Sequence, residues 1–412
     1  MANDLALDGG TPQRTRPFPS VSDAAGRRFG AAEEEAVIGV LRSGQLNSTV
    51  GPQTRTLEDE FAEYLGVDAA VASSSGTSAL HLAIAAVDPE PGDEFITTGL
   101  SDAGTVLPVL AQNAIPVFVD VDPGTGMLDV AAVEAAITAR TRGIIVVHLF
   151  GQPAPVVELR QLADRAGIAL IEDCAQAYLT TVSDGRLAGT VGHLGCFSLQ
   201  QSKHITAGDG GLTVSNDTSL ARRARLFADK AWPRDTDERT HLFLGLNYRM
   251  TELQAAVARV QLTRLDGVVA DRRRNAAELT DRLAGLAGIA TADPQTSAHW
   301  LFPLFLDVDA AGADCQWYAE ALRAEGIPAS GGYLQRPLHL NPVFTEHRTQ
   351  GDSGYPFTVA EHPQTYAPGL CPVTEELIDR RLVTLQWNEN FTDADVADIA
   401  AAITKVHAAA TR

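Results

Sequence analysis

Lysine is almost absent from this sequence of 412 residues. Lysine and arginine together number 32, yet only Lys203, Lys230 and Lys405 are lysines. A guanidinium group stays protonated in proteins, so an arginine cannot replace a lysine where a neutral amine must act as a nucleophile. Chemistry that depends on an amine nucleophile is therefore limited to three positions.

Cysteine is also scarce, and its positions are scattered. Cys174, Cys196, Cys315 and Cys371 form no CxxC pair and no cysteine–histidine cluster of the metal-binding type. We therefore predict no metal site and no disulfide framework. The four side chains are expected to be buried small hydrophobes in a reducing compartment.

Long apolar runs and basic segments are missing as well. No apolar run reaches the roughly 18 residues of a membrane span, and the first ten residues lack a signal-peptide pattern. The net charge of −20, with 52 acidic residues, argues against binding of nucleic acid through its phosphates. We expect a cytoplasmic protein that acts on small molecules, with neither nucleic acid nor membrane as partner.

Short apolar runs alternate with helical patterns from about residue 69 onward. This alternation is typical of parallel strands joined by right-handed helical crossovers, with helices on both faces of the sheet. The predicted strands are 69–75, 94–98, 116–121, 143–150, 168–172, 196–200 and 211–215. The predicted helices between them are 76–87, 105–112, 130–137 and 155–166.

The sequence pattern in the last part of the chain predicts a smaller α+β domain. Its predicted elements are a helical region over 251–286, a strand over 300–308, helices near 314–325 and 393–407, and loops or lids over 329–342 and 345–354. The fold class is therefore α/β, with a mostly parallel central sheet between helices and a second, smaller domain. We divide the chain into an N-terminal arm and large domain, 1–255, and a linker helix and small domain, 256–412.

Lys203 lies in a polar turn between two predicted strands, and the glycine-rich segment Gly208–Gly211 follows it. A lysine that attacks a carbonyl must lose its proton and be held in place, and partial burial promotes both. Taken alone, an ordinary surface lysine in a glycine-containing loop is the simpler interpretation.

Two further segments place polar groups at predicted carboxyl ends of strands, where ligands bind in such sheets. Asp173 follows the strand 168–172, and Ser75-Gly76-Thr77 stands at a junction of strand and helix. A helix N-terminus offers free N–H groups and a favourable dipole to a phosphate. Simple helix capping is an alternative for both segments.

Taken together, these segments resemble the DegT/DnrJ/EryC1/StrS family of sugar aminotransferases. That family is a branch of the fold-type I enzymes that depend on pyridoxal phosphate (PLP). The resemblance covers nearly the whole chain, from Leu5–Gly10 and Leu57–Ala62 through the segments above to Asn247–Met250. Each segment is weak alone, but their order and spacing are specific.

The resemblance implies roles for these residues. Lys203 would hold PLP as a Schiff base and move the proton, and Asp173 would pair with the protonated ring nitrogen. Gln176 would contact the ring oxygen. The phosphate contacts would come from Gly76, Thr77, Ser198 and, across a homodimer with shared active sites, Asn247.

One position departs from the family pattern. Members often carry an aromatic residue that stacks on the cofactor where this sequence has Asp102. Either another residue covers the ring or Asp102 faces the substrate, and capping of the next helix is a third interpretation. Other candidate substrate contacts, for which loop packing is an equal alternative, are Ser48, Thr49, Tyr333, Arg336 and His339.

We therefore expect transfer of an amino group from glutamate or glutamine to a nucleotide-linked keto-sugar or a keto-cyclitol, with pyridoxamine phosphate as intermediate. Such an activity belongs to amino-sugar or aminocyclitol antibiotic biosynthesis. One alternative is a PLP-dependent sugar dehydratase, where histidine replaces the lysine, and His204 is adjacent. Others are an enzyme like aminohydroxybenzoate synthase and a non-catalytic regulator. Spacing to Gly208 favours Lys203, and the presence of Asp173 argues against a regulator.

Overall fold

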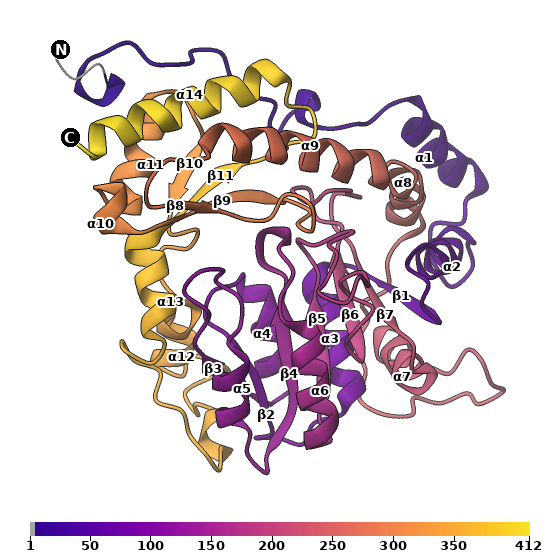
Figure 1. Cartoon of the computed structure of the whole chain (residues 1–412). Coiled ribbons are helices and arrows are strands. Elements are labelled where there is room, and N and C mark those ends of the chain that lie inside the picture. The colour runs from indigo at the N-terminus through magenta and orange to yellow at the C-terminus, as the bar shows by residue number, and fades with distance from the viewer. Residues whose placement is uncertain (1–4) are drawn as a thin grey trace.

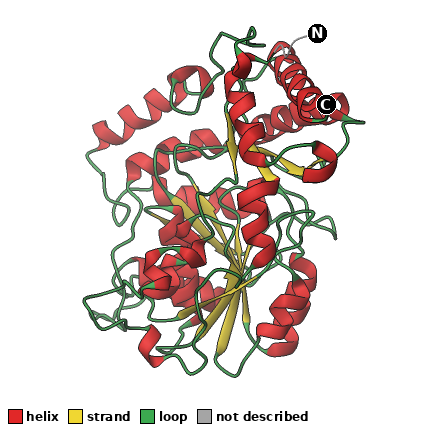
Figure 2. Cartoon of the chain, turned by 90° about the vertical axis from the view of Figure 1, so that its left-hand side faces the viewer, coloured by secondary structure: helices red, strands yellow, loops and turns green. Residues whose placement is uncertain are grey.

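Two β-sheets organise the chain (Figure 1). The computed structural model describes residues 5–412, and within them a seven-stranded sheet lies below a four-stranded sheet in this view. Figure 2 shows the larger sheet as a twisted layer with helices on both sides. In sheet order its strands are β1 (Ala69–Ser73), β7 (Gly211–Ser215), β6 (Leu194–Ser198), β5 (Ala169–Asp173), β4 (Thr141–Val147), β2 (Glu94–Thr98) and β3 (Ile115–Val119).

The strands of the large sheet run parallel except for β7, which is antiparallel to both β1 and β6. The segment 199–210 joins β6 to β7 without a crossover helix, so β7 must return alongside β6. This arrangement confirms the predicted α/β fold with a mostly parallel sheet. It also fixes the turn that contains Lys203 at the carboxyl end of β6.

The helices around the large sheet agree with the sequence pattern apart from their ends, except the last of them, which the pattern did not predict. They are α3 (Gly76–Val87), α4 (Leu107–Ala111), α5 (Val130–Ala136), α6 (Val156–Ala166) and α7 (Thr218–Ala228). The helix predicted over 105–112 is shorter, because Asp102 caps a separate 3₁₀ turn, η3 (Ala103–Thr105), ahead of α4.

Two helices that the sequence pattern did not reveal precede the sheet, α1 (Ala31–Ser43) and α2 (Gln53–Leu65). The helical region expected over 251–286 is also two helices, α8 (Glu252–Leu262) and α9 (Leu265–Leu283). Thr251 caps α8 in a reciprocal box with Gln254.

The four-stranded sheet is antiparallel throughout, in the order β10 (Ala329–Gly331), β11 (Leu382–Gln386), β9 (Leu301–Leu306) and β8 (Ile289–Thr291). The helices α9 and α14 cross above it in Figure 1. The remaining helices of this part are α10 (Val308–Ala311), α11 (Cys315–Ala324), α12 (Pro342–Thr345), α13 (Pro372–Glu376) and α14 (Asp393–Ala410). Single turns of other helix types are η1 (Ala6–Asp8), η2 (Ala24–Gly26), η4 (Leu149–Gly151), η5 (Leu338–Leu340), η6 (Phe357–Val359) and the π-helical η7 (Leu377–Arg381).

The two faces of strand β11 belong to different hydrophobic cores. Val383 and Leu385 pack with α11 and α14 in the core of the small sheet, whereas Leu382 joins the core of the large domain. Leu5 and Phe18 also pack in the small-sheet core, so the N-terminal arm crosses to the C-terminal part of the chain. The division at residues 255 and 256 stays a prediction.

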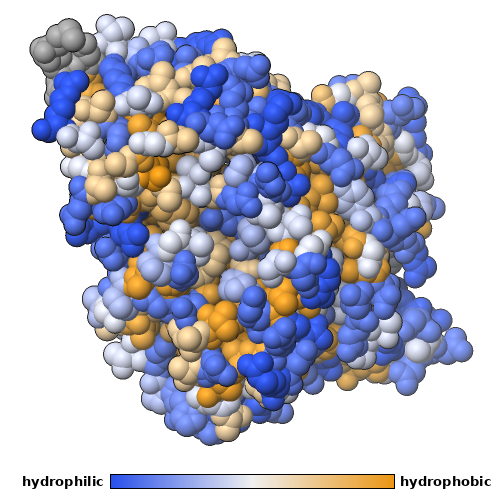
Figure 3. Space-filling model, in the orientation of Figure 1, coloured by the Kyte–Doolittle hydropathy of each residue, from blue (hydrophilic) through white to orange (hydrophobic). Residues whose placement is uncertain are grey.

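The surface of the molecule differs between its rim and its middle, and the cysteines lie in the interior. Figure 3 shows hydrophilic residues around the rim of this face and apolar ones across its middle, between the two sheets. All four cysteines are buried with free thiols, as expected. Among residues 5–412, no helix has both the length and the apolar character that crossing a bilayer requires.

Candidate active site

A cavity of about 370 Å³ opens beyond the carboxyl ends of β4, β5 and β6. Parallel strands direct their carboxyl-terminal residues to this edge, so segments far apart in sequence meet here. Eight of the candidate residues line the cavity: Gly76, Thr77, Asp102, Asp173, Gln176, Ser198, Lys203 and Tyr333.

Lys203 is the amine of this cavity. Burial lowers its pKa from 10.5 to about 8, although the carboxylates of Asp173 and Asp102 oppose the shift. The Nζ atom lies 4.2 Å from the centre of the Trp300 ring. The surroundings thus raise the fraction of neutral amine near physiological pH, which is the form that attacks a carbonyl.

Asp173 ends β5 and is only 6 % exposed. The hydroxyl of Thr105 donates to its Oδ2 at 2.8 Å, and the N–H of Ala175 donates to its Oδ1 at 3.1 Å. Burial nevertheless raises the pKa of this carboxyl above its ordinary value. A cationic partner in the cavity would therefore stabilise its ionised form.

The N-terminus of α3 faces the same cavity. Ser75 caps the helix by accepting a hydrogen bond from the N–H of Ser78. Within residues 5–412 the N–H groups of Gly76 and Thr77 have no hydrogen-bond partner. A Cβ added to Gly76 would lie 2.7 Å from the Cβ of Ser198, so only glycine allows this close approach.

Both polar atoms of the Gln176 side-chain amide are hydrogen-bonded. Its Oε1 accepts from the N–H of Phe150 at 2.7 Å, and its Nε2 donates to the Tyr333 hydroxyl at 3.1 Å. Tyr333 packs edge-on against Phe150 and Trp300. These contacts couple the wall of the large domain to the segment 332–335 that precedes η5.

Asp102 caps the turn that follows it, which is one of the three interpretations given from the sequence. Its Oδ1 accepts from the N–H of Gly104 at 2.7 Å, which caps η3, and its exposed side chain also lines the cavity. Its carboxylate acts on Lys203 by opposing the decrease in pKa of that amine.

Ser48, Thr49 and Arg336 do not line this cavity, and Ser48 and Thr49 line the larger cavity near Met250 instead. Two further candidates, His339 and Asn247, also lie outside it. His339 is fully buried and its Nε2–H donates to Glu375 Oε1 at 3.1 Å, while a Cβ added to Gly99 would lie 2.8 Å from its Nδ1. Asn247 is exposed, and its backbone forms an isolated β-bridge with that of Asp229. The structure thus places neither beside Lys203 of the same chain.

Sequence reasoning missed Trp300 and Thr105. Trp300 was assigned only to a predicted strand, yet its indole N–H donates to the carbonyl of Ser202 at 2.8 Å and its ring covers the Lys203 amine. Thr105 was placed in a helix, although its hydroxyl binds Asp173. No local sequence pattern identifies Trp300 as a residue of the cavity. For Thr105 there is a weak signal, because a threonine shortly after the end of a strand can direct its hydroxyl into such a cavity.

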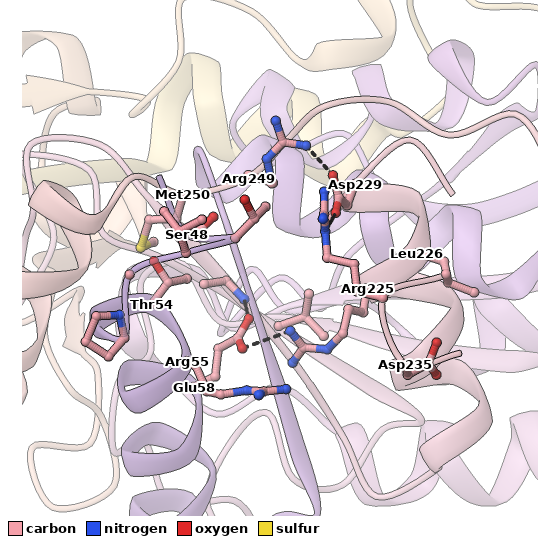
Figure 4. A pocket seen from close by; sticks show the side chains of 18 of the residues that line it. Ser48, Thr54, Arg55, Glu58, Arg225, Leu226, Asp229, Asp235, Arg249 and Met250 are labelled. Atoms are coloured by element: carbon pink, nitrogen blue, oxygen red, sulfur yellow. Dashed lines mark hydrogen bonds and ion pairs between the residues drawn. The ribbon is translucent and has the colours of Figure 1, made fainter. Parts of the chain in front are cut away.

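A larger cavity, about 660 Å³, lies near Met250 on the other side of β1 (Figure 4). Its arginines are mostly neutralised: Arg225 pairs with Glu58 at 2.9 Å, and Arg249 pairs with Asp229. Lysine does not line it among the described residues, so the amine chemistry belongs to the smaller cavity.

One buried trio has the composition of a metal site: His148, Glu172 and Cys174. The Nδ1 of His148 accepts from the N–H of Ala154, so its Nε2–H donates to Glu172 at 2.9 Å. The Glu172 carboxylate also accepts the N–H groups of Gly189, Val191 and Gly192. These hydrogen bonds use the ligand atoms of His148 and Glu172, and this pair supports β5.

The fold is α/β, and its cavity at the carboxyl ends of the strands contains the partly buried amine of Lys203. The model of the DegT/DnrJ/EryC1/StrS aminotransferase family matches residues 28–404, and the chain belongs to that family. The predicted enzyme class, an aminotransferase, is therefore confirmed.

Individual relatives agree with this assignment. The L-glutamine:2-deoxy-scyllo-inosose aminotransferase of Streptoalloteichus tenebrarius is 40% identical, over 98% of this chain and 97% of its own length. The structure of DesI with its TDP-sugar product has a TM-score of 0.83 and 29% identity, covering 100% of this chain and 97% of that one. The structure of 3-amino-5-hydroxybenzoic acid synthase has a TM-score of 0.80 and 26% identity, covering 97% and 100%.

Proposed function

We propose that this enzyme transfers the amino group of glutamine to the keto group of a cyclitol or sugar, with PLP bound covalently to Lys203. The observation that carries the proposal is the position of Lys203, whose pKa is lowered to about 8, in one cavity with Asp173 and the N-terminus of α3. The name of the relative from Streptoalloteichus tenebrarius supports glutamine as donor and a cyclitol as acceptor.

The cavity suits the phosphate of PLP. The unpartnered N–H groups of Gly76 and Thr77 stand at the positive end of the α3 dipole. The hydroxyl of Ser198 lies 2.9 Å from the position that a Cβ of residue 76 would occupy. These three residues would hold the phosphate, and the glycine leaves room for it.

The cavity also suits the pyridine ring. PLP supplies an electron sink whose ring nitrogen must stay protonated. Burial raises the pKa of the Asp173 carboxyl, although hydrogen bonds from Thr105 and Ala175 and the charge of Lys203 oppose the shift. This carboxylate would hold the proton on the ring nitrogen, while Gln176, fixed by Phe150 and Tyr333, would face the ring oxygen.

Lys203 would also move the proton at the substrate carbon. The Trp300 ring beside its Nζ excludes water from one side of the amine, and Asp102 stands across the cavity. The neighbouring His204 is fully buried and its Nε2 is paired with the carbonyl of Ala298 at 2.9 Å. It cannot replace Lys203 in the cavity, which disfavours the dehydratase alternative.

The assembly and location are also part of this proposal. The exposed position of Asn247, away from its own cavity, is compatible with a contact to the phosphate in the partner subunit of a homodimer. Sedimentation analysis of the PLP-loaded protein tests the dimer, and loss of PLP affinity in Asn247→Ala tests the shared site. The cytoplasm stays the predicted location.

The scarcity of lysine gives a direct experiment. Borohydride reduction of the PLP-loaded protein, followed by peptide mass analysis, should find the cofactor on Lys203. Lys203→Arg should lose the label, the absorbance of the bound cofactor and all turnover, whereas the matched control Lys230→Arg, an exposed residue, should keep them. A label on Lys230 or Lys405, or normal turnover by Lys203→Arg, contradicts the proposal.

A further inference from the structure

A second cavity, about 670 Å³, adjoins the one that contains Lys203. Ser202, Trp300 and Tyr333 line both, so these three side chains form the shared wall. The Trp300 ring lies against the Lys203 amine on one side, and Tyr333 meets that ring edge-on at 6.3 Å between centroids. A molecule in the second cavity is therefore one side chain away from the reactive amine.

The small sheet supplies a row of hydrogen-bonding groups to this second cavity. Thr384 and Gln386 lie two residues apart on β11, and Ser330 is directly opposite Thr384 on β10. Because side chains alternate along a strand, these residues share one face. Val383 and Leu385 point to the small-sheet core, which directs that face to the large domain.

The groups in this row are free to bind a ligand. Within residues 5–412 the side chains of Ser330, Thr384 and Gln386 make no hydrogen bond; Thr384 is only 4 % exposed, whereas Ser330 and Gln386 are exposed. Two hydroxyls and an amide can each donate and accept. The opposite walls are aromatic and include Phe18 and Trp387.

Charge is what separates this cavity from the others. In the described part of the chain none of its lining side chains is charged, whereas nine charged residues line the cavity of Figure 4. A phosphate or diphosphate moved from water into such surroundings would lose its hydration without gaining a cationic partner. A neutral ring that carries hydroxyls loses much less and regains hydrogen bonds.

We propose that the second cavity binds the uncharged, hydroxyl-bearing ring of the amino acceptor, and that Ser330, Thr384 and Gln386 recognise its hydroxyls. The apolar face of the ring packs on Trp300, and its keto carbon reaches the amine cavity past Tyr333. The enzyme then prefers a free cyclitol over a nucleotide-linked sugar. This inference rests on the proposed aminotransferase function and adds its acceptor site.

The test separates the two half-reactions. Glutamine alone should convert the bound cofactor to its amino form in wild type and in Thr384→Val/Gln386→Leu at equal rates, followed by absorbance. With 2-deoxy-scyllo-inosose as acceptor, the double variant should show a KM raised about tenfold with kcat little changed, since two hydrogen bonds are lost. Thr404→Val, on the exposed side of α14, is the matched control and should leave both constants unchanged.

Binding without turnover gives a second measurement. Calorimetric titration with myo-inositol, which has the ring hydroxyls but no keto group, should show weaker binding to the double variant and to Ser330→Ala than to wild type. Equal KM and equal inositol affinity in all variants overturn the inference. So does a wild-type enzyme that prefers a TDP-linked keto-hexose to the inosose, or uses neither. Failure of glutamine to react at all instead refutes the proposed function.

Discussion

At the scale of single residues, Gly76 determines whether a phosphate can approach the N-terminus of α3. A methyl group at this position would collide with Ser198 at 2.7 Å. Gly76→Ala should therefore destabilise the protein by about 1–3 kcal/mol and weaken PLP binding. The measurements are urea unfolding of the cofactor-free protein and a PLP titration.

The same substitution elsewhere provides the control. Gly39 lies inside α1, and a Cβ there would meet no atom within 4 Å. Gly39→Ala should stabilise the protein by roughly 0.5–1 kcal/mol, because alanine loses less backbone entropy in a helix. Destabilisation by both variants would show that steric contact with Ser198 is not the cause.

The lowered pKa of Lys203 has a measurable consequence for loading of PLP onto the cofactor-free protein. Only the neutral amine attacks the aldehyde, and the pKa is about 8 rather than 10.5. The loading rate should increase about tenfold from pH 7 to pH 9 and then level off. A rate that keeps increasing to pH 10.5 would show an amine with its ordinary pKa.

Residue roles were predictable where the signal is local. Asp173 follows an apolar strand, and Lys203 lies in the turn between two others, so both could be placed at strand ends from the sequence. The place of Trp300 could not be predicted. Its position over the Lys203 amine depends on the hydrogen bond between its backbone N–H and the carbonyl of Phe150. From the sequence we considered His339 a candidate substrate contact, whereas the structure buries its ring beside Glu375.

At the scale of elements, Glu172 holds the end of β5 that presents Asp173. One of its oxygens accepts from Val191 and Gly192, and the other accepts from Gly189 and His148. In Glu172→Gln one oxygen becomes an NH₂ group that cannot accept, so two buried donors lose their partners. We expect a loss of about 2–5 kcal/mol in unfolding free energy.

This loss should extend to the cofactor. Because β5 carries Glu172 and Asp173 in succession, a displaced loop 189–192 should lower the affinity for PLP as well as the melting temperature. Glu158→Gln, an exposed change on α6, should alter neither. A Glu172→Gln protein with unchanged stability would mean that the loop does not depend on this carboxylate.

Elements were predictable where a local apolar pattern marks them, and length alone did not decide it, since the 13-residue helices α1 and α2 were missed. The strands Glu94–Thr98 and Gly211–Ser215 were predicted with their observed bounds. The strand β10 has only three residues, and its pairing with β11 spans about fifty residues of chain. Such pairing is determined by tertiary contacts, so no local pattern revealed the row of Ser330, Thr384 and Gln386.

At the scale of the whole molecule, the N-terminal arm joins the end of the chain. The guanidinium of Arg14 is 2 % exposed and pairs with Asp395 and Asp398 of α14, each at 2.8 Å. Leu5 and Phe18, on either side of it in sequence, pack in the small-sheet core. Sequence patterns did not indicate this contact, because it joins residues more than 380 positions apart.

Removing Arg14 takes the buried cation from Asp395 and Asp398, which then keep only the exposed Arg16 as a partner. Arg14→Met keeps most of the side-chain volume and should cost about 3–5 kcal/mol of unfolding free energy at neutral pH. The exposed helical pair of Arg282 and Glu278 offers a control, since Arg282→Met should cost only about 0.3–0.5 kcal/mol. Limited proteolysis should cut the arm of the Arg14→Met protein much faster than that of wild type.

The pH dependence gives the same prediction an independent check. Burial alone would raise the pKa of Asp395, but hydrogen bonds from Thr392 and the Arg14 pair outweigh it and lower this pKa below 3.8. The stabilisation by the pair is thus present above pH 3.8 and is lost as the pH decreases through the lower folded value. The difference in unfolding free energy between wild type and Arg14→Met should therefore shrink at that acidic end. A difference that stays constant to pH 2 would show that lost packing, and not the ion pair, holds the arm in place.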